Sequence, residues 1–320
     1  MSTQYVPPHT GEKQSPTAHQ HYHIVPDFFS QAAAMRGCVN EHFDMPFRKS
    51  GPSHQIWDYW YVPNLYTYMR TDPKLLISAR LLHMFQDALR HWAIETLGLS
   101  QISNPYISLY VNGCGQGLHN DAKNGRWAFV YSLTNWERRK FTGGETVVFH
   151  DENYWETDKL TDRAAGSSFY SLVPAHFNQL VVFDDRVIHA VQPLQGPMDP
   201  KEGRIVIHGH IREGGAHVLG ALEQEQVDTI YQEMLTEVQD RVDKLGPQYH
   251  GMMSLRLWIN ANGLVDQSQI LVDRIKRTAP VGPEPQEVSD MILAIAQSLV
   301  FPESEGDSRV TLPVIINHIL

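Results

Sequence analysis

The sequence predicts a mainly β fold with flanking helices, followed by a small α+β unit. Between residues 105 and 212, short strand-like runs alternate with Gly, Asn and Asp turns, which is typical of a barrel or a sandwich. One amphipathic helical pattern precedes this region and a second one follows it. A chain of 320 residues exceeds the usual single domain, so we expect more than one domain.

Local signals place the elements of the β region. Asp72 as N-cap and Pro73 in the first turn begin a helix that ends at Gly98, and its apolar stripe is expected to pack on a sheet. The strands are expected in YISLYV, RWAFVYSLT, ETVVFH, QLVVFD and GRIVIHGHI.

After residue 220 the pattern changes to a small α+β unit. A helix from about 221 to 245 stops at a Gly-Pro pair, and a hairpin turns at Asn262-Gly263. A helix at about 285–299 and a strand at about 310–316 complete the unit. The expected domains are a disordered tail at 1–24, the main β domain with its N-terminal helices at 25–215, a connecting helix at 216–248 and the α+β domain at 249–320.

The composition excludes several classes of partner. Apolar residues make up 42% of the chain and charged residues 19%, which is typical of a globular protein with a full core. A net charge of -10 provides no basic footprint for nucleic acid or anionic lipid. Because neither a long apolar run nor a signal-peptide pattern occurs, we expect a cytoplasmic protein without a membrane partner. Cys38 and Cys114 are expected to be free thiols.

A histidine and a carboxylate lie two residues apart in GLHNDA. On a strand, His119 and Asp121 would project from the same face and could both point at one ion. His189 follows the strand QLVVFD, 68 residues beyond Asp121. Two imidazoles and one carboxylate on a β scaffold form the facial triad of non-haem iron(II), which leaves coordination positions open. A similar pair at His42 and Asp44 has no strand pattern and is expected to be a decoy.

The strand GRIVIHGHI supplies a buried cation. Arg204, Val206, His208 and His210 share one face of this strand, and isoleucines share the other. An inward guanidinium requires a partner, and its planar fork fits a carboxylate. We expect that partner to be the distal carboxylate of a dicarboxylic keto acid that chelates the iron. His208 and His210 are expected either to line the pocket or to be satisfied by neighbouring backbone.

On these residues, the region from about 100 to 215 resembles the 2-oxoglutarate and iron(II) dependent oxygenases, in particular the prolyl-4-hydroxylase-like branch. The motifs occur in the same order: Tyr110 with Gly113, His119-x-Asp121, FTGGETVVF from Phe141 to Phe149, and His189 followed by Gly203 and Arg204. The resemblance implies a double-stranded β-helix, also called a jelly roll or cupin-like fold.

The resemblance also implies the cofactors and the roles of the site residues. Catalytic iron(II) would be held by His119, Asp121 and His189, while 2-oxoglutarate would be gripped by Arg204 with Tyr110 as a second contact. O2 would be the other co-substrate, and ascorbate a stimulant. Prolyl hydroxylases often carry Lys where this chain has Arg204, a departure that weakens the inference about the substrate more than that about the cofactor. The halogenases of this superfamily lack the carboxylate ligand, so Asp121 favours hydroxylation.

Three functions are compatible with the sequence. The leading hypothesis is hydroxylation of an aliphatic C–H of an amino-acid-like substrate, free or peptidyl, with succinate and CO2 as co-products. A tailoring oxygenase of a small natural product, performing desaturation, cyclisation or cleavage, is the alternative within the enzyme class. The alternative outside it is a non-catalytic cupin-like protein that binds a metal or ligand, in which a fourth protein ligand would close the metal site.

Two further regions lead to expectations of their own. The aromatic stretch GPSHQIWDYWYVPNLYTYMRT is expected to form either a substrate wall or ordinary core. Residues 250–320 resemble the C-terminal module of TonB-type proteins, a β-β-α-β unit. Since the anchor of a TonB protein is missing from the sequence, the resemblance implies a module for protein docking or homodimerisation.

Overall fold

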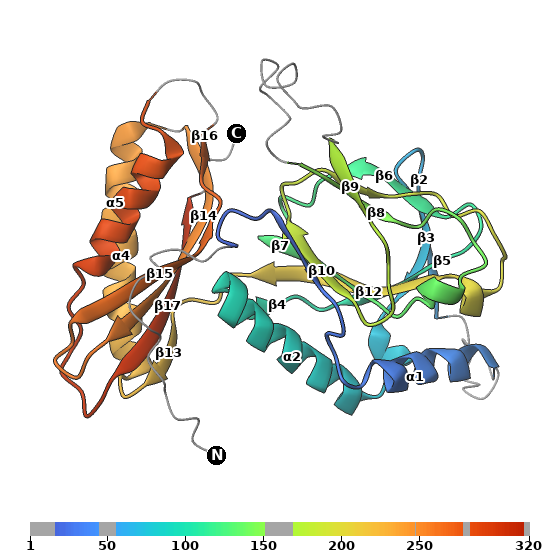
Figure 1. Cartoon of the computed structure of the whole chain (residues 1–320), viewed down its shortest axis with the longest axis horizontal. Helices are drawn as coiled ribbons and strands as arrows, with labels where there is room; N and C mark the ends of the chain where they lie inside the picture. The colour runs from blue at the N-terminus through green and yellow to red at the C-terminus, as the bar shows by residue number, and fades with distance from the viewer. Residues whose placement is uncertain (1–16, 45–55, 151–168, 247, 278–281, 317–320) are drawn as a thin grey trace. The chain divides into compact units, whose positions relative to one another are not determined.

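The computed structural model describes residues 17–44, 56–150, 169–246, 248–277 and 282–316, which fall into two compact units (Figure 1). The curled-sheet unit comprises residues 21–91 and 101–212. The C-terminal unit comprises residues 213–320 together with 1–20 and 92–100. Residues 1–16, which make up most of the expected tail, lie outside the described residues.

The curled-sheet unit is built on one antiparallel sheet in the order β1-β10-β7-β12-β5-β3-β6-β11-β8-β9. β2 pairs with β3, and β4 with β12. The sheet curls on itself, as expected for a double-stranded β-helix core (Figure 1). Its strands are β1 (Tyr22–Val25), β2 (Asp58–Val62), β3 (Tyr66–Thr71), β4 (Gln101–Ile102), β5 (Tyr106–Tyr110), β6 (Gly115–His119), β7 (Trp127–Ser132), β8 (Thr146–Phe149), β9 (Tyr170–Val173), β10 (Leu180–Asp184), β11 (His189–Val191) and β12 (Arg204–Arg212).

Two helices accompany this sheet, α1 (Ala32–Asp44) and α2 (Ala79–Leu97). Phe85 of α2 is fully buried, and its ring lies 4.7 Å from that of Tyr131 and 6.5 Å from that of Phe129, both on β7. Complete burial of such a side chain stabilises the fold by about 1.5 to 3 kcal/mol. The apolar stripe of α2 therefore packs on the sheet, as expected.

The start of this helical region differs from the expectation. Asp72 does act as an N-cap, accepting a hydrogen bond from the backbone N–H of Lys74, but it caps only a 3-10 turn, Pro73–Leu75. The α-helix begins at Ala79, after Ser78, whose hydroxyl accepts a bond from the N–H of Leu81. Ser favours N-cap positions because its oxygen satisfies an otherwise unpaired N–H, so a capping side chain precedes both the 3-10 turn and the α-helix.

The end of the expected tail is ordered in the structure. Residues 22–25 form β1, which pairs with β10, and Ala18 is buried in the C-terminal unit. This difference from the disordered tail expected up to residue 24 has a physical cause. The edge of β10 offers backbone donors and acceptors that the short strand YHIV satisfies, and Tyr22 of this strand packs against buried residues that include Val181 and Phe183.

A hairpin that the sequence did not predict is formed by β2 and β3. Its turn contains Pro63 and Asn64, with Asn64 at φ 62° and the N–H of Leu65 bonded to the carbonyl of Val62. Asn tolerates this left-handed conformation better than most residues. The hairpin consists of the aromatic stretch, and several of its side chains line the cavity described below.

The C-terminal unit contains a second antiparallel sheet in the order β13-β17-β14-β15, with β16 paired to β14. The apolar faces of two helices complete its core. The observed element order β14, β15, α5, β17 is the β-β-α-β order expected, whereas the resemblance to TonB and the docking role stay predictions. Its elements are β13 (His217–Gly220), α4 (Gln224–Leu245), β14 (Tyr249–Ile259), β15 (Val265–Asp273), β16 (Lys276–Arg277), α5 (Pro285–Gln297) and β17 (Ser308–Ile316).

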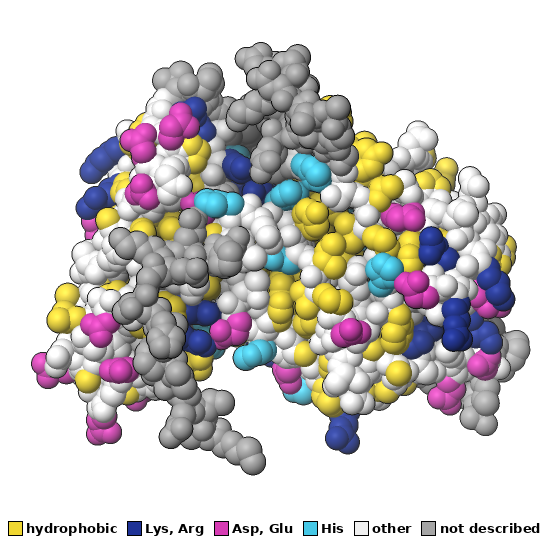
Figure 2. Space-filling model, in the orientation of Figure 1, with side chains coloured by type: hydrophobic (Ala, Val, Ile, Leu, Met, Phe, Trp, Pro, Cys, Tyr) yellow, Lys and Arg dark blue, Asp and Glu magenta, His cyan; other side chains and the backbone are white. Residues whose placement is uncertain are grey.

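On the face drawn in Figure 2, Lys and Arg side chains are interspersed with those of Asp and Glu. None of the helices in the described part of the chain combines the length and apolarity that a membrane crossing requires.

We expect Gly263→Ala to destabilise the protein by more than about 1 kcal/mol, because an Ala at positive φ is strained. Gly263 has φ 79°, and an added Cβ would collide with the carbonyl oxygen of Phe301. Gly37→Ala is the matched control, since Gly37 lies in α1 with open space around it, and we expect that change to stabilise by about 0.5 to 1 kcal/mol. Urea unfolding measures both, and equal midpoints for the two variants would contradict this account.

Candidate metal centre and adjoining cavity

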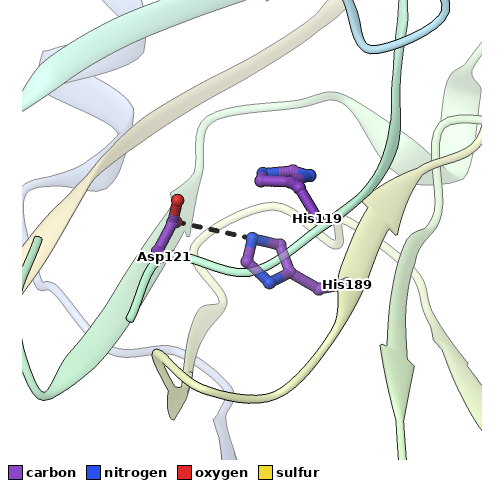
Figure 3. A group of neighbouring side chains, drawn as sticks. All are labelled: His119, Asp121 and His189. Carbon is purple, nitrogen blue, oxygen red and sulfur yellow. Dashed lines mark ion pairs between the residues drawn. The ribbon is translucent and has the colours of Figure 1, made fainter. Parts of the chain in front are cut away.

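Strand pairing brings His119, Asp121 and His189 together. His119 ends β6 and His189 begins β11, and the two residues lie directly opposite each other in the antiparallel register. Their ring centroids are 4.3 Å apart. One potential ligand atom from each of the three side chains lies within 4.8 Å of the others, and Figure 3 shows the three side chains facing one another.

Backbone carbonyls orient both imidazoles. Nδ1–H of His119 donates to the carbonyl of Gly117 at 2.8 Å, and Nδ1–H of His189 donates to that of Val187 at 3.0 Å. A carbonyl oxygen can only accept, so in each neutral ring the proton is on Nδ1 and the lone pair is on Nε2. Hydrogen bonds of this kind fix the tautomer and orientation of metal-binding histidines.

Asp121 reaches the same point by a different route from the one expected. The sequence placed it on the strand of His119, but β6 ends at His119. Asp121 is fixed instead by its backbone N–H, which donates to the carbonyl of Asp185 at 2.8 Å. Its carboxylate lies 3.5 Å from Nε2 of His189 (Figure 3).

The neighbouring imidazoles keep Asp121 ionised. Burial alone would raise the pKa of Asp121, but the contact with His189, together with His210 and His119, lowers it to about 2. Burial and the adjacent His189 lower the pKa of His119, which favours the neutral ring. An ionised carboxylate and neutral imidazoles are the protonation states that bind a metal ion.

The three side chains border a cavity of about 470 Å³ inside the curled-sheet unit. This volume lies in the range of small-molecule sites. The lining combines aromatic, aliphatic and cationic side chains from most of the central strands, including Trp60, Tyr66, Tyr68, Arg70, Tyr106, Tyr110, Phe183, Val191, Arg204, Val206, His208, His210 and Arg212.

Arg204 is the most unusual polar residue of this lining. It is only 1% exposed, and its Nη2 donates to Oγ1 of Thr146 at 3.1 Å. Within the described part of the chain, Nε and Nη1 have no hydrogen-bond partner. Burial lowers the pKa of Arg204, and nearby Tyr110 and Glu145 oppose that shift. A buried guanidinium with unpaired donors facing a cavity fits an anionic ligand.

Tyr110 lies beside this guanidinium. The Cζ atom of Arg204 is 4.8 Å from the centre of the Tyr110 ring. Burial raises the pKa of Tyr110, so its hydroxyl stays protonated. Tyr110 also stacks on Tyr68, with ring centroids 5.1 Å apart.

The remaining histidines on β12 line the cavity, which was one of the two expectations for them. His208 Nε2 lies 2.7 Å from the hydroxyl of Ser108. His210 Nδ1 lies 3.1 Å from Oδ2 of Asp185. Asp121, Asp185 and His210 form a second group with metal-binding potential, but His210 and Asp185 already satisfy each other.

Other candidates do not join the site. His42 and Asp44 lie in α1, and neither belongs to a metal-binding group within the described part of the chain. The sequence did not single out Thr146, although it belongs to the motif FTGGETVVF. A substrate wall was one of the two expectations for the aromatic stretch, and its residues Trp60, Tyr66 and Tyr68 line the cavity. Arg70, at the end of the same stretch, was not singled out.

The donor set fits iron(II). Two imidazole nitrogens and one carboxylate match the facial triad of non-haem iron, and this group has three members in the described chain. A closed structural site would require a fourth protein ligand. The unpaired donors of Arg204 in the same cavity provide an independent fit to an acidic co-substrate.

Comparison with known proteins agrees with this geometry. A family model described as the 2OG-Fe(II) oxygenase superfamily matches residues 106–212, which include the three candidate ligands and Arg204. No curated protein matches the chain.

Several solved structures are similar to this chain at low sequence identity. The chain is similar to a Pseudomonas putida prolyl-4-hydroxylase, at 18% identity and a TM-score of 0.44 over 62% of this chain and 96% of that one. It is also similar to a viral collagen prolyl hydroxylase from Paramecium bursaria Chlorella virus-1, at 11% identity and a TM-score of 0.41 over 62% of this chain and 100% of that one. A third similar structure is an α-ketoglutarate-dependent carbocyclase from nogalamycin biosynthesis, at 13% identity and a TM-score of 0.40 over 64% of this chain and 90% of that one.

We expect His189→Ala and Asp121→Ala to weaken iron(II) binding by more than about 100-fold. Changes to residues that merely orient metal ligands typically cost 10- to 100-fold in affinity, and loss of a ligand costs more. Iron content after anaerobic loading measures this. His176→Ala is the control, since His176 pairs with Glu137 on the surface and lies outside the cavity lining. Full iron content in either ligand variant would contradict the assignment.

Proposed function

We propose that this chain, which the match over residues 106–212 identifies as a 2-oxoglutarate-dependent dioxygenase, hydroxylates an aliphatic C–H bond of an amino-acid-like substrate, free or within a peptide. Its family uses iron(II), 2-oxoglutarate and O2. Bound iron(II) with O2 and 2-oxoglutarate supplies the oxidising power, and succinate and CO2 are the co-products. The single observation that carries the proposal is the buried, partly unpaired guanidinium of Arg204 in the cavity that the three candidate ligands border.

Arg204 would bind the distal carboxylate of 2-oxoglutarate. Thr146 holds Nη2 of the guanidinium, so its direction is set by a second buried residue. Nε and Nη1 remain available for a carboxylate, which would restore the hydrogen bonds lost on burial. The protonated hydroxyl of Tyr110 can donate to the same carboxylate.

His119, Asp121 and His189 would hold the iron. Their fixed orientation leaves the rest of the coordination sphere to the co-substrates, because each imidazole is tied to a backbone carbonyl and Asp121 is tied through its own N–H. Apolar side chains of the lining exclude water from the reacting groups, which limits side reactions of the oxidant. Phe183, Val191 and Val206 provide this apolar surface.

We expect Arg204→Gln to weaken 2-oxoglutarate binding by roughly 30- to 1000-fold. Removal of one partner from a buried charge-assisted pair costs about 2 to 4 kcal/mol, and each 1.4 kcal/mol is a factor of ten. Calorimetric titration of the anaerobic iron(II) protein measures the dissociation constant. Arg204→Lys keeps the charge but not the fork, and we expect an intermediate loss. Arg139→Gln serves as the control, since Arg139 packs on Trp136 outside the cavity lining. Unchanged affinity in Arg204→Gln would refute the assignment of the co-substrate site.

The reaction itself is tested by succinate release. We expect the iron-loaded protein to release succinate from 2-oxoglutarate slowly by itself, and several-fold faster with an accepted member of a panel of amino acids and short peptides. Mass spectrometry of that member should show the gain of one oxygen atom. Asp121→Ala should abolish both succinate release and the mass gain. A protein that binds iron and 2-oxoglutarate but releases no succinate under any condition would contradict the proposed function.

A further inference from the structure

A second guanidinium faces the cavity on β3. Tyr66, Tyr68 and Arg70 occupy alternate positions of this strand and all three line the cavity. Tyr66 packs edge-on against His119 at 5.2 Å, and Tyr68 stacks on Tyr110. The strand therefore runs from the candidate metal ligand, past the candidate co-substrate site, to Arg70. The rise of about 3.3 Å per residue separates the Cα atoms of Tyr66 and Arg70 by about 13 Å.

Two aromatic rings hold Arg70 in place. Its Cζ atom lies 3.4 Å from the centre of the Trp60 ring and 4.5 Å from that of Tyr106. Both rings are partly exposed, at 36% and 43%, so the group lies where the cavity meets solvent. Rings stack on the faces of a guanidinium and leave the N–H groups at its edge available for a carboxylate.

The charges around the cavity are unbalanced. Among the described residues that line it, Arg70, Arg204 and Arg212 are cationic and Asp121 has the only carboxylate. Iron(II) and 2-oxoglutarate carry equal and opposite charges, so their binding leaves this balance unchanged. With Asp121 assigned to the metal and the distal carboxylate of 2-oxoglutarate to Arg204, Arg70 and Arg212 have no anion among the described residues of the lining. Cationic walls of low dielectric favour an anionic ligand.

Neighbouring groups do not neutralise Arg70. Burial, helped by nearby His210, lowers the pKa of His208 to about 3, so the imidazole closest along the wall is neutral. Asp58 lies opposite Arg70 in the hairpin register but is exposed, and no ion pair joins Arg70 to an acidic side chain within the described residues. Arg212 is exposed and donates to the carbonyl of Asn124, which places a second cation at the same cavity.

We propose that the substrate bears a free carboxylate and that Arg70, clamped between Trp60 and Tyr106, binds it. This rests on the proposed function, because it concerns the substrate of that same cavity. Since Arg70 lies along β3 beyond Tyr66 and Tyr68, which contact His119 and Tyr110, the carboxylate is held away from the candidate metal. The C–H bond that reacts is therefore several bonds removed from the carboxylate. N-acylated amino acids and the C-terminal residues of short peptides have this chemistry.

The test compares acids with their amides. Wild-type protein is titrated calorimetrically, anaerobically, with iron(II) and saturating 2-oxoglutarate, against a panel of N-acetyl amino acids and N-acetyl dipeptides, each as free acid and as C-terminal amide. We expect the tightest acid to bind at least tenfold more tightly than its amide. Arg70→Gln should reduce this ratio below about threefold by weakening the acid alone. Arg70→Lys should give an intermediate ratio, because the charge remains while the fork and the stacking are lost.

Controls separate this inference from the proposed function. Arg80→Gln changes an exposed arginine of α2 outside the cavity lining and should match wild type. Amides that bind as well as acids, a panel in which nothing binds, or an acid preference that survives Arg70→Gln would each overturn the inference. If the proposed function is wrong, the iron(II) protein does not bind 2-oxoglutarate, and this is measured before any acid or amide is added. The same acids and amides are also titrated into the Arg204→Gln variant. A preference for acids that Arg204 causes would be lost in this variant, whereas one that Arg70 causes would be kept.

Discussion

The antiparallel register between β6 and β11 is the constraint on which the candidate site depends. It sets His119 directly opposite His189, although 70 residues separate them in the sequence. A slip of one residue would turn one imidazole to the other face of the sheet. Gly117 protects this register: an added Cβ would collide with the carbonyl oxygen of Asn64, so β6 passes close to the β2–β3 turn only because this residue lacks a side chain. The same residue's carbonyl orients His119.

Burial of positive charge is the second constraint. Arg204 begins β12 opposite Tyr110 of β5, and its side chain is almost completely buried. An isolated buried charge is costly, and Thr146 satisfies only part of its hydrogen-bonding capacity. The protein therefore maintains a local instability that an anionic ligand would relieve. A buried charge that lowers the stability of the fold in this way is a marker of a functional site.

Sequence patterns predicted the parts of the site that lie on strands with one apolar face. GRIVIHGHI alternates cleanly, so the cavity side of Arg204 could be deduced from the period of two. β3 has Tyr66, Tyr68 and Arg70 on one face and Thr67, Met69 and Thr71 on the other, so neither face is uniformly apolar. The period of two therefore could not decide between a cavity wall and ordinary core for this strand. The anchoring of Asp121 by the carbonyl of Asp185 could not be predicted, because backbone pairing between loops leaves no trace in residue identity.

The division of the chain into two units also could not be predicted from sequence patterns alone. Residues 92–100, at the end of α2 and just beyond it, belong to the C-terminal unit although the strands that follow them do not. Glu95 explains this assignment, since it pairs with Arg256 at 3.1 Å and with Arg309 at 2.6 Å. Arg256 is 6% exposed and also donates to the carbonyl of Ile94, so loss of Glu95 would leave a buried charge without its partner. A helix that has one amphipathic pattern from Asp72 onward is thus divided between two units. Hydrophobic periodicity predicts that a face is buried, but not to which unit each turn of the helix belongs.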